Sequence, residues 1–342
     1  MNLSQQGRQA LDLHFVNTAR GFGLQPGNPS AGQHYAATPT VAQTIYNKII
    51  EDGNPFLRQI NGAVPVAELK GEKVGMFLSG RVASRTDTTG SGERVPKHLA
   101  DTDSKGYECF KTEFDVAIKY ALIDAWAKFP DFASRYMQLV RQAIGNDMLT
   151  IGWHGTSVST NSDINANPNL EDMNIGWLQK IRDFNGGSQH LAAATNEVVL
   201  GSADFKNLDV LAHEARQMLP IYHRNRDDLV FIVGSDILSS QEGTYYETNG
   251  NTPTEKAMLS GRITKAYGNM PTMYAPFFPE GKVLVTPLKN LSIYVQDSSV
   301  RRLQKDKPEK DEVQDFNSAN QGYVVEDEEL TAFIEGIQLT AE

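Results

Sequence analysis

The sequence predicts an α+β fold organised around a strand that runs directly into a long helix. Between residues 110 and 120, large or apolar side chains alternate with charged ones, as in a half-buried strand. From residue 132 onward the apolar spacing becomes three or four, which indicates an amphipathic helix of about five to six turns. Pro130 and Asp131 are its start signal, and Gly152 and Gly155 are its end signal.

The second half of the chain alternates helical and apolar strand patterns. Residues 205–218 have the spacing of a helix, and residues 229–234 form a continuous apolar run typical of a buried strand. We therefore expect an α/β-like subdomain over residues 201–296. Further short strands are predicted at residues 198–200, 283–285, 291–295, 323–325 and 333–337.

A long polar excursion precedes the central strand. Strand-like patterns occur around residues 62–82 and again from residue 107, and the residues between them are rich in Thr, Gly, Asp and Lys. A hairpin whose tip holds about twenty polar residues is unusual in a compact domain, where loops are mostly 2–6 residues. Such an excursion favours a role outside the domain, such as contact with a neighbouring chain.

The first 35 residues differ in composition from the remainder. Asp12 is their only acid, and Leu11, Phe15, Ala19 and Phe22 have the spacing of a short amphipathic helix. Glycines and prolines follow up to residue 32, as in a linker. This pattern predicts a detachable segment, with an ordinary frayed terminus as the alternative. A helix is expected next, starting at Thr38 and Pro39.

Composition excludes several classes of protein. The 342 residues are 40% hydrophobic and 22% charged, as in a folded soluble protein, and the net charge of −10 disfavours broad gripping of nucleic acid. No signal peptide or run long enough to cross a bilayer is present, so we expect folding in the cytosol and no contact with a membrane. The single cysteine, Cys109, cannot form a disulfide within the chain, and we interpret it as a small strand residue.

The motifs of catalysis and metal binding are incomplete. His213-Glu214 opens like a zinc-protease helix, but Gln217 stands where the second histidine belongs. Residues 101–106 resemble the start of a calcium loop, but Lys105 and Thr112 occupy ligand positions. We therefore expect no enzyme activity, no cofactor and no metal. The acidic run at residues 326–329 could hold a cation, but such runs are more often a solvated surface or a contact with basic residues of a neighbour, for which Arg301 and Arg302 of another subunit are the candidates.

Several stretches, in order, resemble the major capsid proteins of tailed bacteriophages of the Peduovirus type. No single stretch is a catalytic motif, and the resemblance depends on their number and order over about residues 38–338. They are VAQTIYNKIIE from Val41, LKGEKVG from Leu69, SRTDTTG from Ser84, ERVPK from Glu93, DAWAKFPDF from Asp124, GWLQKIR from Gly176, DLVFIVG from Asp228, GNMPTMYAPFFPEG from Gly268, LKNLSIYVQDSSVRR from Leu288 and YVVED from Tyr323.

The resemblance implies the Johnson, or HK-ninety-seven-like, capsid fold, with a long spine helix and an extended β-hairpin loop that lies over a neighbouring subunit. The spine helix would cover residues 121–152. The implied parts are an N-terminal propeptide-like segment (1–35), an N-terminal arm (36–61), the extended loop (62–110), a peripheral domain (111–200 with 297–327) and an axial domain (201–296 with 328–342).

The resemblance also implies a function and partners. The protein would be a structural component that self-assembles into pentamers and hexamers of an icosahedral head around double-stranded DNA, which it would not read by sequence. It would be assembled in the host cytoplasm and end in the virion, with a scaffold, a maturation protease, a portal and possible decoration proteins as partners. The alternatives are another self-assembling phage part, such as a tail or portal protein, or an enzyme with an α/β domain.

Two sets of candidate residues follow. Little resemblance is visible before residue 38, so we expect the protease to cut near Tyr35 and Ala36. Nothing local marks Lys70, Lys73 or Lys97 as reactive, so we expect no covalent cross-link between subunits. The expected contacts between subunits involve Arg85, Asp87, Arg94, Lys97, Arg301, Arg302, Glu326 and Glu328.

Overall fold

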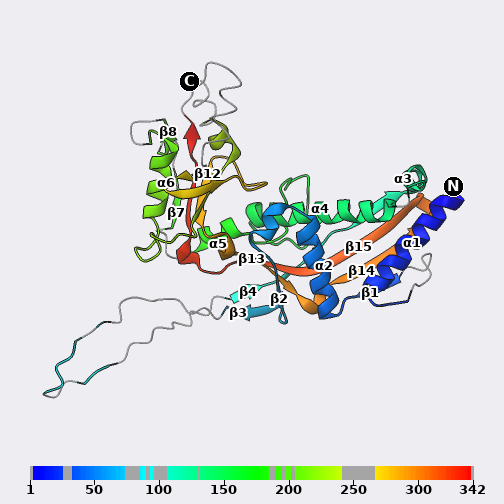
Figure 1. Cartoon of the computed structure of the whole chain (residues 1–342), viewed down its shortest axis with the longest axis horizontal. Coiled ribbons are helices and arrows are strands. Elements are labelled where there is room, and N and C mark those ends of the chain that lie inside the picture. The colour runs from blue at the N-terminus through cyan, green and yellow to red at the C-terminus, as the bar shows by residue number, and fades with distance from the viewer. Residues whose placement is uncertain are drawn as a thin grey trace.

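The computed structural model describes residues 3–25, 33–73, 83, 85–89, 93–95, 106–129, 131–184, 189–193, 197–201, 205–240 and 266–339. Figure 1 shows an elongated molecule, with the long helix α4 (Phe132–His154) lying over a seven-stranded sheet and a six-stranded sheet at one end. Among the described residues, no helix combines the length and apolar character needed to cross a membrane.

The seven-stranded sheet is built on β15, a strand of 14 residues. Its order is β1-β14-β15-β13-β2, and the short strands β5 and β6 also pair with β15. All pairs are antiparallel except β13 with β2. The strands are β1 (Gln33–Ala36), β2 (Asn61–Val66), β5 (Phe110–Glu113), β6 (Val116–Lys119), β13 (Leu291–Gln296), β14 (Arg301–Lys307) and β15 (Glu312–Val325).

The predicted strand at residues 110–120 is present as two pieces. Thr112, Ile118 and Tyr120 are buried, and the intervening Lys111 and Lys119 are exposed, as the alternation predicts. The charged stretch 303–315, in contrast, was not assigned to any element, and the structure places it in β14 and β15. Gln304 and Asp306 of this stretch are buried beneath helix α1 (Gln5–Gly21), which contacts them through His14 and Arg8.

The other helices of this part are α2 (Pro39–Asp52), α3 (Tyr120–Trp126) and α5 (Trp177–Asp183). The spine is therefore two helices, α3 and α4, rather than one helix over residues 121–152. Gly152 does not end α4, which continues to His154 with Gly155 as its C-cap. A Cβ atom on Gly152 would lie 2.3 Å from the Trp177 ring, so this glycine allows α4 and α5 to pack closely.

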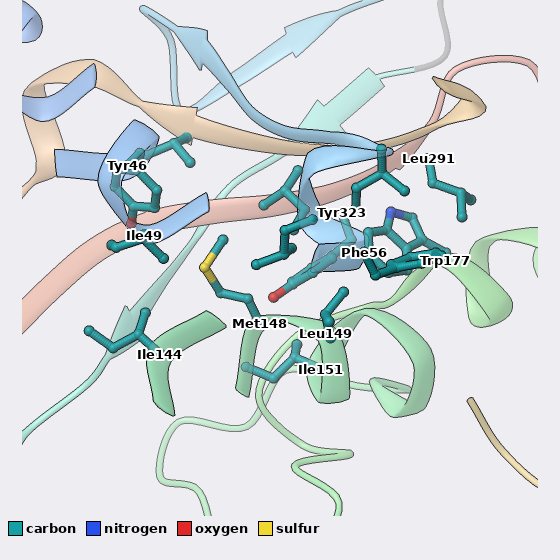
Figure 2. Packing of buried hydrophobic residues seen from close by; sticks show 14 of the residues in the cluster. Tyr46, Ile49, Phe56, Ile144, Met148, Leu149, Ile151, Trp177, Leu291 and Tyr323 are labelled. Carbon is teal, nitrogen blue, oxygen red and sulfur yellow. The ribbon is translucent and has the colours of Figure 1, made fainter. Parts of the chain in front are cut away.

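A single large core joins α2, α4 and α5 to the sheet. Figure 2 shows Tyr46 and Ile49 of α2 facing Met148 of α4 across the core, with Trp177 packed near Tyr323 of β15. The rings of Trp177 and Tyr323 are 5.4 Å apart and nearly perpendicular, a favourable edge-to-face arrangement. The Trp177 Nε1 group donates to the Ser292 carbonyl at 3.0 Å, so the buried indole is satisfied.

The second sheet has the order β10-β11-β9-β12-β16-β7. Its strands alternate between two cores, since Ile232 and Leu284 face the large core whereas Phe231 and Val285 face helix α6 (Leu208–Gln217). Burial on both faces explains the continuous apolar run of residues 229–234. The strands are β7 (His190–Ala192), β9 (Val230–Val233), β10 (Ala266–Tyr267), β11 (Met270–Met273), β12 (Lys282–Thr286) and β16 (Ala332–Glu335), and a separate pair joins β8 (Val199–Leu200) to β17 (Gln338–Leu339).

Three strands join sheets across the predicted domain boundaries, which stay predictions. β13 (residues 291–296, predicted axial) belongs to the seven-stranded sheet. β7 and β8 (residues 190–192 and 199–200, predicted peripheral) pair with β16 and β17. Short 3-10 turns connect the strands at Pro55–Arg58, Leu288–Asn290, Asp297–Ser299, Pro308–Lys310 and Glu328–Leu330.

Candidate assembly surfaces

The described residues contain no cluster of metal-ligating side chains. No group of three or more His, Cys, Asp or Glu side chains among them is arranged to hold a metal ion. His213 and Glu214 are exposed on α6, as expected for solvated helix residues. Cys109 is buried, and burial raises the pKa of its thiol to about 11, so it is protonated and unreactive at neutral pH.

The extended excursion begins and returns as a short ladder beside the seven-stranded sheet. β3 (Lys70–Glu72) pairs with β4 (Gly106–Glu108), and the Cys109 amide donates to the Leu69 carbonyl at 2.8 Å. The Tyr107 ring packs over Gly71 and meets the ring of Tyr294 at 5.0 Å. The base of the excursion is thus held against β13 of the sheet.

Lys73 fixes the base of the excursion to the end of β15. Its Nζ atom donates to the Val325 carbonyl at 2.5 Å and to Glu328 Oε1 at 3.1 Å, and its side chain is 8% exposed. A buried ammonium needs such partners, because desolvation without them is costly. This anchoring role of Lys73 could not be predicted from local patterns, since the Val325 carbonyl belongs to a strand about 250 residues away.

The predicted contact residues of the excursion are exposed where they are described. Arg85, Asp87 and Arg94 all lie at the surface, and Figure 1 places this part of the chain well away from both sheets. Asp87 Oδ1 accepts from the Thr89 amide at 2.9 Å, and hydrogen bonds from Thr89 lower the pKa of Asp87. Lys97 lies outside the described residues. The exposed groups are free to meet another chain.

Three residues with predicted contacts to another subunit, Arg302, Glu326 and Glu328, also have partners within the chain, and those contacts stay predictions. Arg302 forms a bidentate ion pair with Asp315, its neighbour on β15, and the two side chains are 10% and 5% exposed. Glu326 accepts from the Tyr294 hydroxyl at 3.0 Å, and Glu328 pairs with Lys73. Among these four predicted contact residues, only Arg301 is exposed.

The predicted processing point lies in an ordered strand. Tyr35 and Ala36 pair with Arg302 and Arg301 across the β1–β14 ladder, and Tyr35 is only 1% exposed. Its ring packs on Phe22, with centroids 5.1 Å apart. A protease needs an extended, accessible backbone, so cutting here requires β1 to leave β14 first. The site itself stays a prediction.

Helix α1 packs against the rest of the subunit. The predicted apolar residues Leu11, Phe15, Ala19 and Phe22 are all buried. Leu11 and Phe15 join a satellite core whose other buried members are Leu3, Ile118, Tyr120, Ile123 and Val313. Polar contacts add to this packing, since the Ser4 amide and hydroxyl both donate to Asp124 Oδ1, at 3.1 and 2.6 Å.

A buried carboxylate lies beneath α1. Asp306 of β14 has a side chain that is 1% exposed and pairs with Arg8 at 3.0 Å, while the Tyr120 hydroxyl donates to its other oxygen. Further along α1, the His14 ring accepts a hydrogen bond from the side-chain amide of Gln304 at 3.0 Å. Sequence reasoning missed Arg8 and Asp306 because the pair joins segments at opposite ends of the chain.

These surfaces can be compared with known proteins. The sequence profile of phage major capsid proteins of the P2 family matches residues 17–337. The chain belongs to this family. It is a structural protein of the phage head and virion, not an enzyme, and the expected capsid function is confirmed.

Individual relatives support the same family. The chain is 33% identical to the capsid protein of Escherichia phage P2 over 349 residues, covering 98% of this chain and 96% of the relative. It is 32% identical to the major capsid protein of Serratia phage KSP20, covering 96% of both chains.

Solved structures confirm the capsid fold. A chain of the satellite phage P4 procapsid, solved with its size determination protein, matches with a TM-score of 0.70 and 34% identity, covering 86% of this chain and 99% of that one. A chain from a structure of Gordonia phage Cozz shares the fold at a TM-score of 0.51 and 14% identity, covering 85% of this chain and 87% of that one. The predicted HK-ninety-seven-like fold and homo-oligomeric capsid assembly are therefore confirmed.

The comparisons correct one expectation. The family match begins at residue 17, inside α1, and the phage P2 relative covers 98% of the chain, although resemblance was expected to start near residue 38. The point at which resemblance begins therefore gives no support to a cut at Tyr35 and Ala36.

Proposed function

We propose that this capsid protein forms the pentamers and hexamers of an icosahedral head that encloses double-stranded DNA. Heterologous contacts between copies close into such rings, and many weak contacts then sum over the shell. The observation that carries the proposal is the excursion anchored by Lys73, whose exposed charges have no role inside one subunit.

In this proposal residues 62–110 are the extended loop and lie over a neighbouring subunit through Arg85, Asp87 and Arg94. The seven-stranded sheet without β1 and β2, together with α4 and α5, is the peripheral domain, now including β13, and the second sheet with α6 is the axial domain, now including β7. Residues 36–61 act as the N-terminal arm. Exposed Arg301 at the end of β14 is a further contact to a neighbour.

Processing and partners complete the proposal. A phage protease removes the N-terminal segment, with Tyr35 and Ala36 as the candidate point, once β1 is accessible. Assembly takes place in the host cytoplasm on a scaffold and around a portal, and decoration proteins can bind later. The shell would enclose DNA without reading its sequence. It would also bind the DNA only weakly, because a net charge of −10 gives little general affinity for phosphate.

Deletion of residues 86–104 tests the role of the extended loop. The subunit should stay folded by circular dichroism, since the loop base and the cores are untouched, but electron micrographs should show no shells. A control variant that replaces the same residues by a Gly/Ser linker of equal length should also fail, because it removes the charged contacts while keeping the loop's reach. Normal shells from both variants would contradict the proposed role of the extended loop in contacts between subunits.

A further inference from the structure

The face beneath α1 has the properties of a docking surface for a helix. Its apolar part is formed by Ile118, Tyr120, Ile123 and Val313, all at most 7% exposed while α1 is in place. Its polar part is Asp306, which is buried beside them. We refer to these five residues as the α1 floor. Without α1 the floor would present apolar side chains around one carboxylate.

The carboxylate of the floor depends on α1 for its cation. Among the described residues, Arg8 is the only ion-pair partner of Asp306. A helix that covers the floor has to bring a cation, because Asp306 would otherwise be buried without an ion-pair partner, which is costly. The apolar residues around it favour a helix that also carries leucine or phenylalanine.

Helix α1 matches this floor in charge and in shape. Residues 1–25 contain one acid, Asp12, against Arg8 and Arg20. Gly7 allows the close approach, because a Cβ atom there would lie 2.2 Å from Asp124 Oδ1. The fitting partner is therefore an amphipathic helix with a glycine followed by an arginine, and then apolar residues three and seven positions later, as in Gly7, Arg8, Leu11 and Phe15.

We propose that the floor accepts α1 of a second copy of this chain as well as its own, so that α1 is exchanged between neighbouring subunits. The contacts are the same in both arrangements, as in any exchange of an identical element. Eleven residues, 22–32, connect α1 to β1, and an extended chain of that length reaches about 36 Å. Within one subunit the tether favours its own α1, whereas in a shell the neighbours are close enough to compete.

The exchange of α1 goes beyond the proposed function. It can be disproved while the capsid function stands, since shells can form with every α1 on its own floor. It also assigns the first 25 residues a task before any processing, which is to link subunits in the unprocessed shell.

Two full-length variants test the exchange. Arg8→Glu leaves the floor intact but gives α1 a repelling carboxylate, and Asp306→Asn leaves α1 intact but removes the carboxylate of the floor. In a mixture, the native α1 of the second variant can bind the native floor of the first. We expect at least tenfold more 1:1 heterodimer by native mass spectrometry than dimer in either variant alone. Hydrogen exchange of residues 5–21 should also slow on mixing.

The control carries both Arg8→Glu and Asp306→Asn in one chain. A mixture with the Arg8→Glu variant contains no Arg8, and a mixture with the Asp306→Asn variant contains no Asp306, so the native ion pair cannot form in either mixture. The control should give no enrichment with Arg8→Glu. If Arg8→Glu is insoluble, Arg8→Gln removes the cation without adding repulsion and takes its place. A second measurement titrates a fluorescent peptide of residues 3–24 into the Arg8 variant, with an Arg8→Glu peptide expected to bind at least tenfold more weakly. Absence of both the heterodimer and peptide binding would overturn the proposal.

Discussion

At the scale of single residues, two buried carboxylates lie on neighbouring strands, and one of them joins parts of the chain that are far apart. Asp306 pairs with Arg8, and Asp315 pairs with Arg302. Both carboxylates lie in the strongly charged stretch of residues 303–315. The sequence could not reveal their burial, because the arginines that make it tolerable come from other elements.

Gly152 is a second residue whose role depends on a distant partner. We predict that Gly152→Ala destabilises the subunit by about 1–3 kcal/mol, the usual cost of overpacking a core. Alanine gains about 1 kcal/mol of helix propensity over glycine, but the new methyl group would clash with the Trp177 ring, which is fully buried and cannot move aside. The shift in the urea unfolding midpoint of the dissociated subunit measures the effect.

Gly145 provides the control for this prediction. It lies in the same helix, and a Cβ atom there would meet only the Leu57 methyl group at 3.1 Å and the Gly53 backbone at 3.3 Å. Gly145→Ala should therefore cost less than Gly152→Ala. Equal stability of the two variants would mean that the α4–α5 packing relaxes more easily than the geometry suggests.

At the scale of elements, local patterns predicted most helices and strands. The apolar stripes of α1, α4 and α6 and the alternation in β5 and β6 are confirmed, since each depends only on nearby residues. The start of α2 at Pro39 is confirmed as well. The pairing of β14 with β15 and the insertion of β13 between β15 and β2 were missed, because sheet order depends on contacts that no local pattern encodes.

The anchoring of the extended loop leads to a prediction about assembly. Lys73→Met should destabilise the base of the loop by about 3–5 kcal/mol, the usual cost of leaving one partner of a buried ion pair alone. The core of the subunit is elsewhere, so the variant should fold but give few or misshapen shells. Sedimentation of assembled particles and the thermal midpoint of the subunit measure the two effects.

Lys70→Met is the matched control. Lys70 is on the same ladder and pairs with Glu108, but its side chain is 70% exposed. Exposed pairs contribute about 0–1 kcal/mol, so this variant should assemble nearly as well as the unchanged protein. Equal loss of shells in both variants would show that any charge change in the loop base blocks assembly.

At the scale of the whole molecule, the two ends respond to acid through different groups. Near one end, burial and the nearby Arg302 lower the pKa of His14 from 6.5 to about 4, opposed by Asp315. Near the other end, burial would raise the pKa of Glu335, but hydrogen bonds and charge from Arg182, His190 and Lys282 lower it to about 2. The large core includes residues of both sheets.

The two shifts have different pH windows. His14 is kept neutral in the folded chain, so the unfolded state binds the additional proton, and stability falls as the pH drops from about 6.5 to 4. Glu335 is kept ionised, so its stabilising contribution is complete above about 4.5 and is lost as the pH falls toward 2. Acid should therefore loosen α1 before it weakens the second sheet.

Hydrogen exchange of the dissociated subunit, corrected for the intrinsic effect of pH, measures this order. Residues 5–21 should lose protection between pH 6.5 and 4, while residues 330–335 keep theirs until the pH falls below about 4. His14→Gln should remove the first loss, because no proton then binds preferentially to the released helix. Glu335→Gln should leave that loss unchanged and weaken the second sheet already at neutral pH, since Arg182 and Lys282 lose their carboxylate partner. Simultaneous loss of protection at both ends would show that α1 unfolds only with the whole subunit, which would also argue against its exchange between copies.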